Sequence, residues 1–453
     1  MLPAPLILVL AVALAYLAAH VAFDWLAKRF LLVSGAEYLL LGILLGPQVS
    51  GVLSANTMSG FGPLITLALG WIGAIVGTQF TLPTLVRIPG LTYRLAFIEA
   101  LTTAFIVAGA SAYLIAWLTD SALREAVVPA VALGAIAAVS APAGIEVATR
   151  RLRAQREPIV RQLQVATAVD ALVGIVAMGL LFCLRHPVDS SAGATVTPTE
   201  WAVISVAIGV VGGALFHLFL GGETHTDRLF ISLAGAIILA SGAAAYLHLS
   251  PVLTSAIVGA TLINTSRSRE AIARTLASSE RPFYFAMLVF AGASWRPSGL
   301  TWWAAPVLLF LVLRVVGKIG GARLGARIND ALPIVGRDWG RALLGQGGLA
   351  VALALDYTRF AGTLLPNVVF SAAIASVLLT DVTAARLIHG VVSAMRIRGA
   401  GRERRGARDA NGAGRGARDA GRETAVDGRG GRVEEAPSPE VEAGPARDAE
   451  GGE

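Results

Sequence analysis

The sequence predicts an all-α polytopic membrane protein of about 13 transmembrane helices, and three observations lead to that prediction. Of the 453 residues, 55% are hydrophobic and only 15% are charged, and the mean hydropathy is +0.67. No soluble domain buries that much apolar surface. Residues 163–184 are long enough and apolar enough to cross a bilayer as a helix, and comparable stretches recur along the chain. Basic residues gather in every second loop between these stretches.

The predicted helices follow from the mean hydropathy of a window of about 19 residues. They cover approximately residues 3–23, 31–46, 61–79, 92–118, 127–148, 163–184, 201–220, 228–247, 250–264, 282–295, 301–320, 340–356 and 366–390. The first lacks the positively charged start of a secretory signal, so we interpret it as a retained helix. The single cysteine, Cys183, excludes an intramolecular disulfide framework.

The distribution of arginine and lysine predicts the orientation in the membrane. With the amino terminus outside, the outer loops hold only Arg124, Arg185, Arg296 and Arg359. All the other loop arginines and lysines then face the cytoplasm, as the positive-inside rule requires. The formal charge of +7 therefore reports orientation and does not indicate a nucleic-acid partner. The predicted location is the cell (inner or plasma) membrane, with the carboxyl terminus inside.

The composition changes abruptly after about residue 395. Residues 396–453 are rich in Gly, Arg, Asp, Glu and Ala and contain almost nothing to bury. Such a segment cannot offset the entropy cost of folding. We therefore expect a transmembrane domain over residues 1–395 and a disordered cytoplasmic tail over residues 396–453.

Two of the predicted helices are interrupted by helix-breaking residues. The fifth contains the break Ser140-Ala141-Pro142, and the twelfth contains Gly345-Gln346-Gly347-Gly348. Proline removes an amide donor, and clustered glycines loosen a helix. In lipid the freed backbone groups need partners, so such breaks survive only beside protein or a water-filled cavity. Paired broken helices in the two halves of a chain predict a binding site near the middle of the membrane.

Isolated charges lie at the same predicted depth as the breaks. Asp170, Glu99 and Arg314 each lie roughly 10 Å from the inner end of their helices at 1.5 Å per residue, and Lys318 follows Arg314 by one turn. A carboxylate within an apolar helix is costly and normally marks an ion or proton path. These charges and the two breaks therefore predict one polar site.

The roles of the three balancing charges stay open at this point. Lys318 either contributes to the site or, as we favour, extends its ammonium to the inner membrane surface. Glu99 either acts directly or forms a salt bridge to Arg314 that braces the core. Arg314 stays charged under biological conditions, so it balances charge without carrying the exchanged proton.

The ordered set of motifs over about residues 31–390 resembles the monovalent cation/proton antiporter superfamily, nearer its second large branch. The motifs are Gly42–Pro47 (GILLGP), Ser140-Ala141-Pro142, Asp170, Ser250–Asn264, Phe290–Ala293, Arg314 with Gly317-Lys318, and the glycine-rich twelfth helix. The resemblance implies two inverted repeats of six helices with crossed broken helices, and a core domain that moves against a dimerising domain. It also implies that Asp170 binds either the cation or the proton.

The sequence departs from the family pattern beside that aspartate. Family members often carry Asp-Asp or Asn-Asp where this chain has Val169-Asp170. Thr167, three residues earlier, is a candidate replacement ligand, and Ser140 is another. The predicted metal ligand for Na⁺ is Asp170.

These observations lead to a functional hypothesis of secondary transport, with no enzymatic activity and no cofactor. The chain is expected to exchange Na⁺, or else K⁺ or Li⁺, for H⁺ as a homodimer in the lipid bilayer. With only Asp170 to exchange one proton for one cation, the exchange is expected to be electroneutral and one-for-one. Two alternatives stay open: a sodium-coupled organic-anion carrier of the same fold, and a transport-inactive membrane scaffold or sensor.

Overall fold

A computed structural model of the chain describes residues 35–151, 158–186, 196–220, 226–266, 268–296, 300–359, 365–380 and 383–395. Helices account for the secondary structure of these residues, and no strand occurs among them. The first predicted transmembrane helix, residues 3–23, and the predicted tail, residues 396–453, lie outside the described residues.

The longer described helices overlap the predicted stretches, although Arg269–Ser294 begins well before the predicted residue 282, and the short helices Ala55–Gly60, Leu82–Arg87 and Leu332–Val335 were not predicted. The described helices are α2 (Ala36–Leu45), α3 (Ala55–Gly60), α4 (Gly62–Thr78), α5 (Leu82–Arg87), α6 (Gly90–Thr119), α7 (Leu123–Ala138), α8 (Pro142–Arg151), α9 (Pro158–Leu184), α10 (Pro198–Leu220), α11 (Thr226–Tyr246), α12 (Pro251–Thr265), α13 (Arg269–Ser294), α14 (Leu300–Ile328), α15 (Leu332–Val335), the 3₁₀ helix η1 (Trp339–Leu343) and α16 (Gly348–Arg359). Two further helices, Pro366–Thr380 and Thr383–Met395, cover the last predicted stretch.

The helices are long and apolar enough for a membrane. Within the described residues, six can cross a bilayer by length and composition, or seven if Pro366–Thr380 and Thr383–Met395 form one bent span. Shorter apolar helices are Gly62–Thr78 and Pro251–Thr265. On α6 the side chains of Phe105, Tyr113 and Trp117 are largely exposed, which suits a surface that faces lipid. The chain is an all-α polytopic membrane protein, and the total of thirteen spans stays a prediction.

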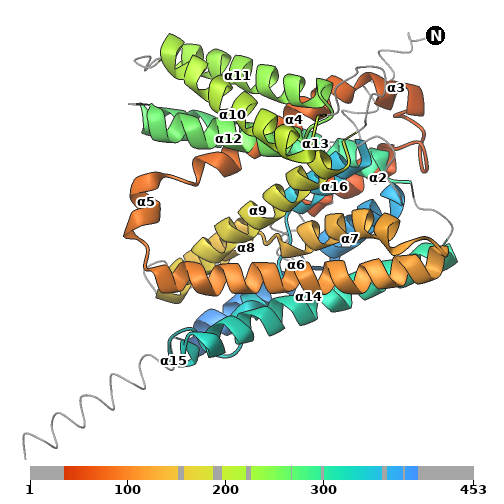
Figure 1. The fold of residues 1–453 in the computed structure, drawn as a ribbon, viewed down its shortest axis with the longest axis vertical. Coiled ribbons are helices and arrows are strands. Elements are labelled where there is room, and N and C mark those ends of the chain that lie inside the picture. Colours follow the sequence, from red (N-terminus) through yellow and green to blue (C-terminus); the bar gives the residue numbers. More distant parts are fainter. Residues whose placement is uncertain are drawn as a thin grey trace, which may run out of the picture. The chain divides into compact units, whose positions relative to one another are not determined.

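The helices pack as two groups. In the first, α6 lies along α14, α7 and α9, and η1 packs on α14 (Figure 1). In the second, α4 lies along α12, α2 lies along α13, and α10 and α11 pack on α12. The groups meet where α9 contacts α10 and α12 and where α16 contacts α12, α13 and α4. We call these contacts the seam.

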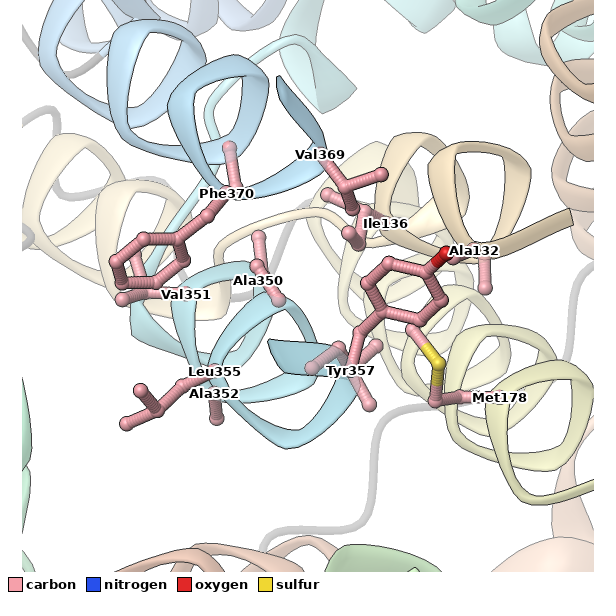
Figure 2. Close-up of a cluster of buried hydrophobic side chains, with 14 of the residues drawn as sticks. Ala132, Ile136, Met178, Ala350, Val351, Ala352, Leu355, Tyr357, Val369 and Phe370 are labelled. Atoms are coloured by element: carbon pink, nitrogen blue, oxygen red, sulfur yellow. The ribbon is translucent and has the colours of Figure 1, made fainter. Parts of the chain in front are cut away.

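A continuous apolar cluster holds α16 in place. Tyr357 of α16 packs with Met178 of α9 and Ile136 of α7, and Phe370 of the following helix closes the cluster (Figure 2). These side chains are almost completely buried. The second half of the broken twelfth span is thereby fixed against the helix that carries Asp170.

In the second group, α4 and α12 approach so closely that only glycine fits at some positions. A Cβ atom on Gly259 would contact the carbonyl oxygen of Ala74, and one on Gly77 would contact that of Ala256. Membrane helices associate through such small residues because lipid provides no hydrophobic force between them.

We predict that Gly259→Val destabilises the protein by about 1–3 kcal/mol, because the added methyl groups force two backbones apart. Thermal unfolding of the purified protein in detergent measures the effect. Gly242→Val is the matched control, since no heavy atom lies within 4 Å of a Cβ at that position of α11. Equal melting temperatures for the two variants would contradict the close packing of α4 on α12.

Candidate ion-binding site

The two predicted helix breaks meet each other, as the sequence predicts. Helix α7 ends at Ala138, and Pro142 begins α8, so Val139–Ala141 form the first break. The second break lies between η1 and α16. The amide of Ala141 donates to the carbonyl of Gly345 at 2.8 Å, and the hydroxyl of Ser140 donates to the carbonyl of Leu343 at 2.8 Å. These bonds satisfy backbone groups that would otherwise be unpaired in a membrane.

Gln346 adds a third link between the breaks. Its side-chain amide donates to the carbonyl of Ile136, near the end of α7, at 2.6 Å. Its backbone amide donates to the hydroxyl of Thr380 at 3.1 Å. The glycines beside it permit close approach, since a Cβ on Gly348 would collide with the ring of Tyr284, whose hydroxyl accepts the Gly348 amide.

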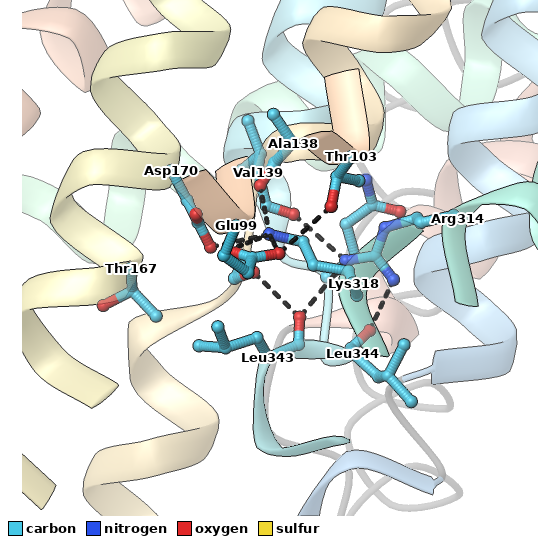
Figure 3. Close-up of polar contacts among 12 residues, drawn as sticks. Glu99, Thr103, Ala138, Val139, Thr167, Asp170, Arg314, Lys318, Leu343 and Leu344 are labelled. Carbon is cyan, nitrogen blue, oxygen red and sulfur yellow. Dashed lines mark hydrogen bonds and ion pairs between the residues drawn. The ribbon is translucent and has the colours of Figure 1, made fainter. Parts of the chain in front are cut away.

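Lys318 lies at the centre of a buried cluster of charges. Its ammonium is 2.8 Å from Oδ2 of Asp170 and 3.1 Å from Oε1 of Glu99 (Figure 3). It also donates to the carbonyl of Ala138, in the last turn of α7, at 2.6 Å. Thr103 donates its hydroxyl to the same Glu99 oxygen at 3.1 Å. We call Glu99, Asp170 and Lys318 the charge cluster; all three side chains are completely buried.

Two sequence-based interpretations are wrong. Lys318 does not extend to the inner membrane surface, because its side chain is completely buried. Of the two roles left open for Glu99, the salt bridge to Arg314 does not form, because Glu99 pairs with Lys318. The ammonium of Lys318 has two carboxylates and a backbone carbonyl as partners, and these contacts offset the cost of its burial.

Arg314 binds the carbonyl ends of both broken helices. Its guanidinium donates to the carbonyl of Leu344 at 2.6 Å and to that of Val139 at 3.1 Å. The last carbonyls of a helix lack intrahelical partners and carry partial negative charge. Arg314 is almost completely buried and neutralises this charge at the crossing point. The hydrogen-bond partners of Arg314 are thus backbone carbonyls, and its charge-balancing role in transport stays a prediction.

The two predicted hydroxyl ligands are buried but already bonded. Ser140 braces the break as described, and Thr167 donates to the carbonyl of Gln164 in its own helix at 2.9 Å. Figure 3 places Thr167 on α9 away from the centre of the charge cluster. Their oxygens can still accept, so their role as cation ligands stays a prediction.

Among the described residues, several buried polar atoms near the crossing lack a hydrogen-bond partner. They include Oδ1 of Asp170, Oε1 of Gln346 and the hydroxyl of Ser376. Leaving a buried oxygen unpaired costs about 1–3 kcal/mol, so such atoms call for an explanation. The free oxygen of Asp170 is an available ligand for a small cation.

A cavity lined by both polar and apolar side chains reaches the stretch of α9 next to Asp170. It has a volume of about 460 Å³ and lies between the end of α4, helix α5 and the first half of α9. Gln79, Arg87, Arg161 and Gln164 are among its polar lining residues, and Val169, which precedes Asp170 in the chain, also lines it. We call this cavity the vestibule. It extends to the residue beside the aspartate.

Sequence reasoning missed the partners of Lys318 and the part played by Thr103 and Tyr284. The inward orientation of Lys318 could have been predicted from the sequence. Arg314 and Lys318 are four residues apart, and residues at that spacing share one face of a helix. A polar Arg314 therefore implied an inward Lys318. The carbonyl partners of Arg314 had no signal in the sequence, because they depend on how the breaks cross.

Comparison with known proteins gives a match at the level of structure. No family model and no curated protein matches the sequence. Among solved structures, the fold is similar to that of the sodium proton antiporter MjNhaP1 from Methanocaldococcus jannaschii. The TM-score is 0.62 at 15% sequence identity, over 86% of this chain and 99% of that chain. This polytopic membrane protein therefore has the fold of a cation/proton antiporter.

Proposed function

We propose that the chain is a secondary transporter that exchanges a monovalent cation for protons by alternating access in the cell membrane. Na⁺ is the preferred cation, with K⁺ and Li⁺ as the other candidates. The observation that carries the proposal is the state of Asp170: one carboxylate oxygen binds Lys318, and the other has no partner although it is completely buried. The similar fold of a sodium proton antiporter supports it.

The geometry provides for competition at Asp170. A cation that binds its carboxylate meets the ammonium of Lys318 only 2.8 Å from Oδ2. Two positive charges at that distance in a buried site repel strongly. The cation therefore binds well only when the protonated ammonium of Lys318 withdraws toward Glu99. Protonation of Asp170 also weakens cation binding, because a neutral carboxyl group attracts a cation far less than a carboxylate does.

The charge of the cluster supports one-for-one exchange. With both carboxylates ionised and Lys318 protonated, the three groups carry one net negative charge. Either one monovalent cation or one proton neutralises it. The return of the empty site is then unfavourable because an unbalanced charge would move through the membrane.

The arrangement of the helices supports alternating access. The vestibule opens toward α5 and the arginines Arg87 and Arg161, which the positive-inside rule assigns to the cytoplasm. Movement of the first helix group along the seam would close this approach and open the other. Two inverted repeats, a homodimer with an external amino terminus and a cytoplasmic tail at residues 396–453 complete the proposal.

The proposal is tested with the full chain reconstituted into liposomes that contain a pH-sensitive dye. A sodium gradient is expected to drive proton movement in the opposite direction. Its rate is expected not to respond to a membrane potential clamped with potassium and valinomycin, because the proposed exchange moves no net charge. A response to the potential would show that Lys318 or Glu99 also exchanges a proton. Glu99→Gln in the same assay then distinguishes Lys318 from Glu99. The variant is expected to transport independently of voltage only if Glu99 is the second group that exchanges a proton.

The same assay separates the alternatives. A sodium-coupled anion carrier would need Arg314 to bind its substrate, yet both terminal nitrogens of Arg314 already bind backbone carbonyls. This observation favours the cation. Absence of any ion flux from correctly inserted protein would favour a scaffold or sensor in which the charge cluster is a fixed salt bridge.

A further inference from the structure

The seam contains an apolar crevice that the transport mechanism leaves unused. It has a volume of about 420 Å³ and lies between α9 on one side and α4, α10 and α12 on the other. Its lining residues include Leu172 and Cys183 of α9, Val206 of α10 and Ala256 of α12. Every residue that lines it is apolar.

The crevice opens to the surface of the membrane-spanning part. Val176 and Leu180 of α9 and Val206 of α10 line it and are 36%, 45% and 48% exposed. Helices α9 and α10 are both long and apolar enough to cross a bilayer. The medium at the opening is therefore the hydrocarbon of the lipid bilayer.

Water is a poor occupant of this space. A buried water molecule needs two to four polar partners, and the lining residues provide none from their side chains. An empty crevice is also unfavourable, because the lining atoms lose their dispersion contacts on one side. The apolar lining therefore favours an apolar occupant.

The crevice is too small for a whole helix to lie inside it. An α-helix with its side chains is about 10–12 Å wide, so even four turns fill well over about 1,000 Å³. Neither a helix from residues 1–34 nor one from a second copy of the chain fits into about 420 Å³. A thin, linear, flexible hydrocarbon chain does fit.

We propose that this crevice binds one acyl chain of a bilayer phospholipid. The chain enters between α9 and α10 and lies against Ala256 and Cys183. At its inner end the crevice is separated from the vestibule by Phe80, which lines both cavities. The lipid thereby seals the seam beside the aqueous approach to Asp170. This last role rests on the proposed function, whereas binding of the acyl chain does not.

The test uses the full chain in lipid nanodiscs that contain a phosphatidylglycerol with a photoreactive diazirine in its acyl chain. After illumination, mass spectrometry maps the labelled peptides. The expected result is strong labelling of residues 172–183 and 253–260. Two variants fill the crevice from different helices, Ala256→Phe on α12 and Ala202→Phe on α10, and each is expected to lose this labelling. Ala214→Phe is the matched control, because Ala214 is exposed on α10 and does not line the crevice.

Several outcomes decide the matter. Labelling that is the same in all three variants would overturn the proposal, since it would reflect general contact with lipid. A second experiment uses ordinary lipid and places a photoreactive group on Cys183. Cross-links from Cys183 to residues 1–34 would also overturn the proposal. If one filling variant does not fold, the other gives the same comparison. Proton flux is measured separately. If a filling variant loses lipid labelling but keeps its flux, the acyl-chain site stands and its sealing role is refuted. Absence of flux in the unmodified chain would count against the proposed function alone.

Discussion

Replacing Asp170 with asparagine is expected to abolish sodium-driven proton movement completely while leaving the protein folded in the membrane. Asparagine keeps the shape of the side chain and accepts a hydrogen bond from Lys318 through its oxygen. It cannot titrate, and it offers a cation no negative charge. The measurement is dye-reported proton flux in liposomes, together with the elution profile of the purified variant.

Asp338→Asn is the matched control for this substitution. Asp338 is about half exposed and pairs with Arg323 at 3.1 Å on the protein surface, away from the charge cluster. The control is expected to transport at the rate of the unmodified chain. Wild-type flux from the Asp170→Asn variant would refute the assignment of Asp170 as the exchanging group.

Replacing Lys318 with methionine is expected to give the largest loss of stability of any single change in the site. The ammonium is the shared partner of two completely buried carboxylates at 2.8 and 3.1 Å. Removing one partner of a buried ion pair costs about 3–5 kcal/mol, since it leaves uncompensated charge in a medium of low dielectric constant. Thermal unfolding of the purified protein in detergent measures the loss.

Two further variants show whether the loss of stability comes from the unpaired buried carboxylates. Arg323→Met removes the cation of the half-exposed pair with Asp338, and solvent limits its effect to about 0–1 kcal/mol. The double variant Lys318→Met with Glu99→Gln is expected to regain part of the lost stability, because only one carboxylate then lacks its partner. A Lys318→Met variant that melts at the temperature of the unmodified chain would show that the carboxylates do not depend on the ammonium.

Much of the fold follows from local features of the chain. The positions of the longer helices were readable from hydropathy, as for residues 163–184 and α9 (Pro158–Leu184). The breaks were readable because Pro142 cannot continue α7 and because Gly345, Gly347 and Gly348 weaken the twelfth helix. The contact between the two breaks was also predictable, since backbone groups freed at a break in a membrane helix must find hydrogen-bond partners.

The sequence by itself determined that the protein lies in a membrane, where two of its helices break, and that Asp170 lies within an apolar stretch. These are properties of neighbouring residues, so they survive in any arrangement of the helices. Only the tertiary structure decided that Lys318, and not Arg314, pairs with Asp170 and Glu99, which lie 148 and 219 positions away along the chain. Pairing over such separations depends on how α6, α9 and α14 are rotated against one another. That rotation is fixed by the packing of entire helix faces, and no local sequence pattern encodes it.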